Sequence, residues 1–294
     1  MSLPILKEIS SAFRSLNPSE VESLAEHRVS FGVLAADDAV AAEIFSFLIP
    51  SDLSEARSRE IGLSITRIAS EDDFGRCTVG LAESAVPHPA HFYPFDPSRP
   101  ETAVKAILDE HEDAWIPLAR WFPAFREEVI ERLIWKVSKE NAMFTVATAV
   151  PNIVPSIVTV PWAVGEFASD TAFLTMNQVR MAFLIGASSD RSVGYLEQKG
   201  QIGSIVAAAF GWRAIARELA GKIPAGGGLA AKGLTSFAGT YVVGKSLERY
   251  FRFGSKLTRA ERRELYSQAF ERGRDAVQRI VERTTGRLAA ARNA

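Results

Sequence analysis

Residues 28–48 read RVSFGVLAADDAVAAEIFSFL, and they carry the main fold signal of the chain. The first part, RVSFGVL, has the β-branched and aromatic content of a strand. Residues 41–48 have the apolar spacing of a helix, which must end before Pro50. A short turn over residues 35–40 separates the two. This order of strand, loop and helix predicts an α/β fold, and a phosphate-binding loop would lie at the turn.

The turn lacks the residues that a phosphate-binding loop needs. Such a loop uses glycines whose backbone N–H groups face the phosphates, and a Lys-Ser/Thr pair for the terminal phosphates and magnesium. The turn instead contains Asp37 and Asp38, with no glycine and no lysine. Two carboxylates there would repel the phosphates of a nucleotide. We therefore interpret residues 1–115 as a small, degenerate GTPase-like (Rossmann-like) α/β domain that holds no cofactor.

The same segment contains further signals for helices and strands. We expect a helical lead over residues 4–27, strands over residues 63–69 and 78–83, and a helix over residues 101–111. A proline-rich stretch lies between the last strand and this helix. His88 and His91 fall within the stretch, but the proline between them favours an exposed loop, so we expect no metal site.

Composition excludes several classes of protein. The 294 residues include 34 Lys+Arg and 35 Asp+Glu, so no global positive field exists to hold nucleic acid. The apolar fraction of 47% is enough for a buried core and excludes extensive disorder. Cys77 is the single cysteine, which excludes internal disulfides and multi-cysteine metal sites. Residues 1–16 lack the unbroken apolar core of a signal peptide, so we expect a cytoplasmic protein.

The charge is distributed unevenly along the chain. Residues 1–115 hold 9 basic and 20 acidic side chains, residues 116–255 hold 15 and 10, and residues 256–294 hold 10 and 5. The acidic part carries the strand signals, while the rest has helical patterns. We therefore expect three parts: the α/β domain over residues 1–115, a hydrophobic helical domain over residues 116–254, and a C-terminal basic amphipathic helix over residues 255–294.

A long uncharged segment dominates the middle of the chain. Residues 141–165 carry no charged side chain, which is enough length to cross a bilayer as one helix. Pro151, Pro155 and Pro161 disfavour that continuous helix. We expect one helix from about residue 124 to Val150 and another that continues to about residue 187. Such a hairpin needs cover from other helices or from lipid, and both interpretations stay open.

A second phosphate-loop signal lies far from the first. Residues 239–246 read GTYVVGKS, which fits the pattern G-x-x-x-x-G-K-[ST] through Gly239, Gly244, Lys245 and Ser246. A working motif follows a buried strand and has small intervening residues, whereas these are bulky or β-branched. We favour a helix in which the two glycines allow close packing, and we keep an NTP-binding site as the alternative.

Two short motifs in the helical part resemble a known family. Residues 217–228 read RELAGKIPAGGG, and residues 238–244 read AGTYVVG, followed by Tyr250 and Phe251. These motifs resemble domain-of-unknown-function family 697, the YcjF-type helical domain that follows Era-like GTPase domains in bacteria. The resemblance covers residues 120–253 or so. It implies a hydrophobic, often membrane-associated helical domain and a GTPase partner domain, but no reaction of its own.

The C-terminal part predicts a basic amphipathic helix. Thr258 and Glu261 fit a capping box, and the apolar residues after them recur at helical spacing. Its arginines could dock on the acidic N-terminal domain, on another copy of the chain, or on anionic lipid.

These features predict a non-catalytic bacterial interaction or membrane-associated scaffold protein. We expect no catalytic residue and no nucleic-acid partner. The expected partners are another protein or a second copy of the chain, with peripheral contact at the inner face of the cytoplasmic membrane. An integral membrane protein is a further alternative. The expected partner-contact residues are Trp212, Arg213, Lys222, Gly226, Gly227 and Gly228.

Overall fold

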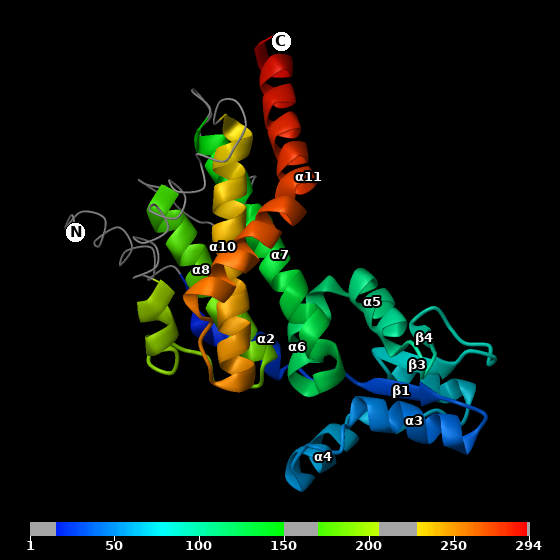
Figure 1. Cartoon of the computed structure of the whole chain (residues 1–294). Coiled ribbons are helices and arrows are strands. Elements are labelled where there is room, and N and C mark those ends of the chain that lie inside the picture. The colour runs from blue at the N-terminus through cyan, green and yellow to red at the C-terminus, as the bar shows by residue number, and fades with distance from the viewer. Residues whose placement is uncertain (1–15, 150–169, 206–227, 293–294) are drawn as a thin grey trace. The chain divides into compact units, whose positions relative to one another are not determined.

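The computed structural model describes residues 16–149, 170–205 and 228–292 (Figure 1). Its contacts divide the chain into two compact units. The sheet unit comprises Ser19–Glu131 and Gly186–Ser192, and the helical unit comprises Met1–Pro18, Arg132–Ile185 and Val193–Ala294. The expected combination of a mixed α/β part and a helical part is thus confirmed.

The N-terminal half contains a short four-stranded sheet and its helices. In chain order the elements are α2 (Pro18–Glu26), β1 (Phe31–Leu34), α3 (Asp38–Leu48), α4 (Glu55–Gly62), β2 (Ile65–Arg67), the 3-10 helix η1 (Glu71–Arg76), β3 (Val79–Glu83), β4 (Phe92–Phe95), α5 (Pro100–Glu110), the 3-10 helix η2 (Glu112–Ala114) and α6 (Trp115–Trp121). The strands expected over residues 63–69 and 78–83 correspond to β2 and β3. The helices expected over residues 41–48 and 101–111 correspond to α3 and α5.

The sheet is parallel throughout and has the strand order β2-β1-β3-β4. Phe31 of β1 pairs with Ile65 of β2 on one side and with Val79 of β3 on the other. α3 contacts β1 and β3, whereas α5 contacts β4 (Figure 1). The chain thus places β2 on one side of β1 and then places β3 on the other side of β1. This reversal of the strand order is the arrangement of doubly wound α/β sheets.

β4 lies in the proline-rich stretch, to which the sequence analysis assigned no strand. Only eight residues separate β3 from β4, and no helix crosses between them. β4 pairs with β3 alone and is therefore an edge strand, where Pro94 needs no ladder hydrogen bond on its open side. The prolines that obscured this strand are compatible with its position at the edge.

In the core of the sheet unit, the aromatic ring of Phe92 packs directly against two glycines. A Cβ at Gly32 or at Gly80 would overlap the Phe92 ring, so the ring occupies the space above both glycines. Phe74 lies edge-on to Phe92 with ring centroids 5.3 Å apart. Cys77 is buried in the same cluster, and burial, with a further contribution from Asp73, raises the pKa of its thiol. The cysteine therefore packs as a small apolar residue.

The segment 186–192 joins the sheet unit through one aspartate. Asp190 has a φ of 56°, a left-handed conformation that aspartate tolerates better than most residues. Its Oδ2 lies 3.3 Å from Nη2 of Arg57, and its Oδ1 lies 3.7 Å from Nε of Arg120. The Arg57 guanidinium also covers the Trp121 ring, 4.6 Å from its centroid. These contacts fix a short connection onto α4 and α6.

The helical unit is built from long helices that approach one another at glycines. The helices are α7 (Pro123–Thr148, from Arg132 onward), α8 (Asp170–Ser188), α10 (Leu229–Phe253) and α11 (Arg259–Arg292). A Cβ at Gly244 of α10 would lie 2.6 Å from Cγ1 of Ile134 in α7. A Cβ at Gly233 would lie 2.8 Å from Cγ1 of Val277 in α11 and 2.9 Å from Cγ2 of Val146 in α7. Glycine therefore sets the spacing between α10 and both neighbours.

A buried polar network joins α7, α8 and α10. Nδ2 of Asn141 donates to Oγ1 of Thr240 at 2.8 Å, and Nδ2 of Asn177 donates to Oδ1 of Asn141 at 2.8 Å. Next to them Arg180 pairs with Glu140 at 3.2 Å. Burial lowers the pKa of Arg180, and the nearby Glu140 carboxylate opposes that shift. Buried polar groups are costly without partners, so this network favours one register of the three helices.

α11 begins at the expected capping box and packs inside the helical unit. Oγ1 of Thr258 accepts from N–H of Glu261 at 3.2 Å, and Oε2 of Glu261 accepts from N–H of Thr258 at 2.7 Å. Val277 is fully buried in a cluster with Phe237 of α10. The apolar face of this basic helix is thus covered by α10. Both helices belong to the helical unit.

The uncharged segment is only partly covered by these ranges. α7 ends at Thr148 and α8 begins at Asp170, and residues 150–169, including all three prolines, lie outside the described residues. Among the helices that the structure describes, none combines the length and the apolar character needed to span a bilayer.

Candidate functional site at the carboxyl edge of the sheet

The carboxyl ends of β1 and β3 meet where the strand order reverses. In doubly wound sheets ligands bind beside the strand ends at this point, because the chain leaves the two strands in opposite directions. Here β1 ends at Leu34, and the residues that follow lead directly into α3. β3 ends at Glu83, which is partly buried. The sheet thus brings the turn after β1 and the last residue of β3 together.

The Glu83 carboxylate occupies the backbone N–H groups of the turn after β1. Its Oε2 accepts from N–H of Ala36 at 2.9 Å and from N–H of Asp37 at 3.2 Å. In phosphate-binding loops, N–H groups at this strand-to-helix turn point at the phosphate. In this chain the N–H groups of Ala36 and Asp37 instead donate to a carboxylate of the chain itself.

The two aspartates of the turn have other structural roles. Oδ1 of Asp37 accepts from N–H of Ala39 at 2.7 Å, and Asp37 is the N-cap of α3. Asp38 forms an ion pair with Arg67 at the end of β2. Both aspartates are exposed. The edge therefore combines three carboxylates with one guanidinium, a charge pattern that disfavours a phosphate ligand and favours a cationic or N–H-donating partner.

The sequence analysis identified Asp37 and Asp38 but not Glu83 or Arg67. The signal for Glu83 is weak in the sequence, because it is only an acidic residue at the end of the run VGLAE. Its partners, Ala36 and Asp37, lie 47 and 46 residues earlier, respectively. Only the pairing of β1 with β3 brings them within hydrogen-bonding distance.

The histidines of the sheet unit bind local partners. His88 Nδ1 lies 3.2 Å from the carbonyl oxygen of Pro89, and His91 Nε2 lies 3.2 Å from that of Phe74. His111 Nε2 lies 3.0 Å from the Tyr93 hydroxyl. Across residues 16–149, 170–205 and 228–292, no group of three or more His, Cys, Asp or Glu side chains is arranged to hold a metal ion.

The motif Gly239–Ser246 lies entirely within α10. In a helix interior each backbone N–H donates to the carbonyl four residues earlier, so these groups do not surround a phosphate. Lys245 forms an ion pair with Glu248, and Oγ of Ser246 donates to the carbonyl oxygen of Val242 at 2.6 Å. Gly244 is the close-approach site against Ile134 described above. In this conformation the segment is a packing surface and not a loop.

The expected partner-contact residues are described only at one end. Gly228 is the N-cap of α10 and is exposed. The others lie outside the described residues: Trp212, Arg213, Lys222, Gly226 and Gly227.

Comparison with known proteins gave no relative. No family model, no curated protein and no solved structure matched the chain.

Proposed function

We propose that this chain is a non-catalytic interaction protein whose sheet unit is a GTPase-like domain that has lost its phosphate-binding loop. The main support is the position of Glu83, whose carboxylate accepts from the N–H groups of Ala36 and Asp37 at the strand-to-helix turn. The parallel order β2-β1-β3-β4 is compatible with a doubly wound fold of this kind.

A nucleotide would bind at this turn only against two opposing effects. A phosphate would have to displace a carboxylate that makes charge-assisted hydrogen bonds, which are about twice as strong as neutral ones. It would then lie beside Asp37 and Asp38, with no lysine in the turn to offset their charge. Both effects support a protein that holds a partner instead of converting a nucleotide.

The partner in this proposal is another protein or a second copy of the chain, at or near the inner face of the cytoplasmic membrane. The exposed carboxylates of Asp37 and Asp38 favour a basic surface on that partner. The family resemblance of residues 120–253 is compatible with the same role.

A nucleotide titration tests the proposal. Fluorescent GTP and ATP analogues, with magnesium, are titrated into the full-length protein and into its Lys245→Ala variant. We expect no saturable binding at millimolar nucleotide and no hydrolysis above the buffer rate in either protein. Saturable binding to the unmodified protein would overturn the proposal. Loss of that binding in the Lys245→Ala variant would assign it to the α10 motif, and its persistence would assign it to the sheet edge.

A further inference from the structure

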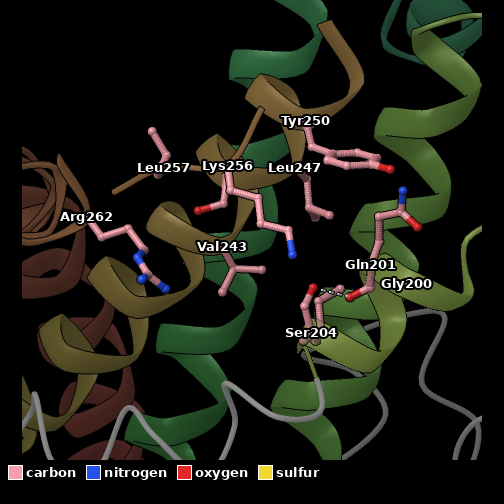
Figure 2. A pocket seen from close by; sticks show the side chains of 11 residues that line it. Gly200, Gln201, Ser204, Val243, Leu247, Tyr250, Lys256, Leu257 and Arg262 are labelled. Carbon is pink, nitrogen blue, oxygen red and sulfur yellow. Dashed lines mark hydrogen bonds between the residues drawn. The ribbon is translucent and has the colours of Figure 1, made fainter. Parts of the chain in front are cut away.

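A pocket of about 350 Å³ lies in the helical unit, beside the Val243 and Ser246 end of the α10 motif (Figure 2). It is formed by residues 200–205, by one face of α10, and by the connection from α10 into the first turns of α11. The lining residues are Gly200, Gln201, Ser204, Ile205, Val243, Ser246, Leu247, Tyr250, Lys256, Leu257 and Arg262. The volume is within the range of about 300–1,000 Å³ that is typical of small-molecule sites.

The described part of the pocket wall is mainly apolar, and the charged residues in it have one sign. Val243 and Leu247 of α10 form the wall with Ile205, Leu257 and the Tyr250 ring. Among residues 16–149, 170–205 and 228–292, the eleven that line the pocket include two cations, Lys256 and Arg262, and no carboxylate. An apolar cavity with charges of only one sign is suited to an amphipathic ligand of the opposite charge.

The side chain of Lys256 reaches into the pocket. Figure 2 shows it extending from the α10–α11 connection, with its ammonium group in the space between Val243, Leu247 and Gln201. The Arg262 guanidinium lies on the other side of Val243 in the same view. The two cations therefore approach the apolar wall from two directions.

Both cations lack a carboxylate partner in the part of the chain that the structure describes. Lys256 makes no hydrogen bond or ion pair with any described residue, and Arg262 makes one weak bond, from Nε to the carbonyl oxygen of Thr258 at 3.4 Å. The nearby acids are engaged elsewhere. Glu248 pairs with Lys245 and Arg252, and Glu261 pairs with Arg249 at 3.2 Å. The positive charge of the pocket is thus uncompensated by these acids.

We propose that this pocket binds an amphiphile with one anionic headgroup and a medium-length hydrocarbon chain. The carboxylate or phosphate headgroup contacts Lys256 and Arg262, and the chain lies against Val243, Leu247 and Ile205. A nucleotide is a poorer fit, because Tyr250 is the only aromatic among the lining residues that the structure describes, and those residues include no glycine-rich turn. The inference is independent of the sheet edge, since none of its residues belongs to the sheet unit.

Decanoate, kept below its micelle concentration, is the probe for this proposal. Calorimetry and ligand-observed NMR on the full-length protein should show saturable binding of decanoate. Acetate, which has the headgroup alone, should not bind. Decyltrimethylammonium, which has the same chain length and the opposite charge, should bind at least about tenfold more weakly, the factor that corresponds to about 1.4 kcal/mol. Shortening the chain to octanoate should weaken binding by up to about fourfold for each methylene removed.

Matched variants test the lining residues. Lys256→Gln and Arg262→Gln should each weaken decanoate binding by about five- to tenfold, because each removes a charge-assisted hydrogen bond. Lys232→Gln and Arg259→Gln remove the same charges from exposed positions of α10 and α11 outside the pocket, and they should leave the affinity unchanged. Ser204→Trp places a large ring at an exposed lining position and should abolish binding without unfolding the core.

Three outcomes would overturn the proposal: no saturable binding of decanoate, equal binding of decyltrimethylammonium, or unchanged affinity in both charge variants. Vesicle flotation identifies the source of the ligand. Binding to phosphatidylglycerol vesicles but not to phosphatidylcholine vesicles, with competition by decanoate, indicates a membrane lipid. Binding of decanoate without vesicle binding indicates a free amphiphile. Glu83→Ala should bind decanoate normally, so this test and the nucleotide titration fail independently.

Discussion

The turn after β1 and the middle of α10 each carry one half of what a phosphate-binding loop requires. The turn has the position, between a buried parallel strand and a helix, but it presents Asp37 and Asp38, and its N–H groups bind Glu83. The segment Gly239–Ser246 has the residues, but it lies within a continuous helix. A phosphate site needs both the backbone conformation and the side chains, and each region shows what is lost when one is missing.

The largest effect on stability is expected at Gly244, a glycine of the α10 motif to which we assign a packing role. Gly244→Ala adds a Cβ close to Ile134, and overpacking of this kind costs about 1–3 kcal/mol. Lys245→Ala should cost less than about 1 kcal/mol, because the Lys245 side chain is partly exposed and Glu248 keeps its ion pair with Arg252. Urea unfolding monitored by far-UV circular dichroism measures both.

Gly286→Ala is the control for this substitution. Gly286 lies in α11 of the same unit, and a Cβ there would have no neighbour within 4 Å. Replacing an exposed helical glycine by alanine should stabilise the protein by up to about 1 kcal/mol. A destabilisation at Lys245 larger than that at Gly244 would indicate that the packing interpretation of the motif is wrong.

The next effect is expected at Glu83. Glu83→Ala leaves the N–H groups of Ala36 and Asp37 without their acceptor, at a cost of about 1–2 kcal/mol in the free energy of unfolding. Inorganic phosphate should recover part of this loss in the variant by binding the vacated N–H groups, and should have no such effect on the unmodified protein. Thermal unfolding with and without phosphate gives the comparison.

Glu43→Ala provides the matched control, since it removes an exposed carboxylate of α3 in the same unit. It should change neither the stability nor the response to phosphate. If Glu83→Ala were as stable as the unmodified protein, the Glu83 hydrogen bonds would not stabilise the turn.

A smaller effect separates the two roles of Asp37. Asp37→Ala removes the N-cap of α3 and should cost about 1 kcal/mol, whereas Asp37→Asn keeps a capping oxygen and removes only the charge. We therefore expect Asp37→Asn to remain close to the unmodified protein in stability. Equal destabilisation by both substitutions would mean that the charge, and not the cap, matters at this position.

The smallest effect concerns alkaline pH. Burial, followed by the hydrogen bond and charge of Glu110, raises the pKa of Tyr93 well above its ordinary value near 10. Above pH 10 the unfolded chain loses the tyrosine proton while the folded chain keeps it, so the stability from this residue is lost as the pH rises. Tyr93→Phe should flatten the alkaline decline of the melting temperature, and an unchanged decline would contradict this assignment.

Much of the fold could be predicted from periodicity. The strand, turn and helix of residues 28–48, the strand near residue 80 and the long helices α7, α8 and α10 follow local patterns of apolar residues, which are visible in the sequence. β4 could not be predicted in this way, because Pro94 reads as a loop signal unless the strand is known to lie at an edge.

The candidate site could be predicted only in part. The turn and its aspartates are contiguous in the sequence, whereas the Glu83 bond depends on the pairing of β1 with β3. The network of Asn141, Asn177 and Thr240 could not be predicted either, because its residues lie on three separate helices. The pocket cations Lys256 and Arg262 look like ordinary surface charges until the α10–α11 connection brings them to one cavity.

The most direct test of the account observes both halves of the comparison at once. The backbone amide resonances of Ala36, Asp37, Gly244 and Lys245 are followed by two-dimensional NMR while GTP with magnesium is titrated into the full-length protein. The account predicts that none of the four resonances shifts in a saturable way, because Glu83 fills one set of N–H groups and the α10 helix bonds the other. A saturable shift at Ala36 and Asp37, or at Gly244 and Lys245, would contradict it.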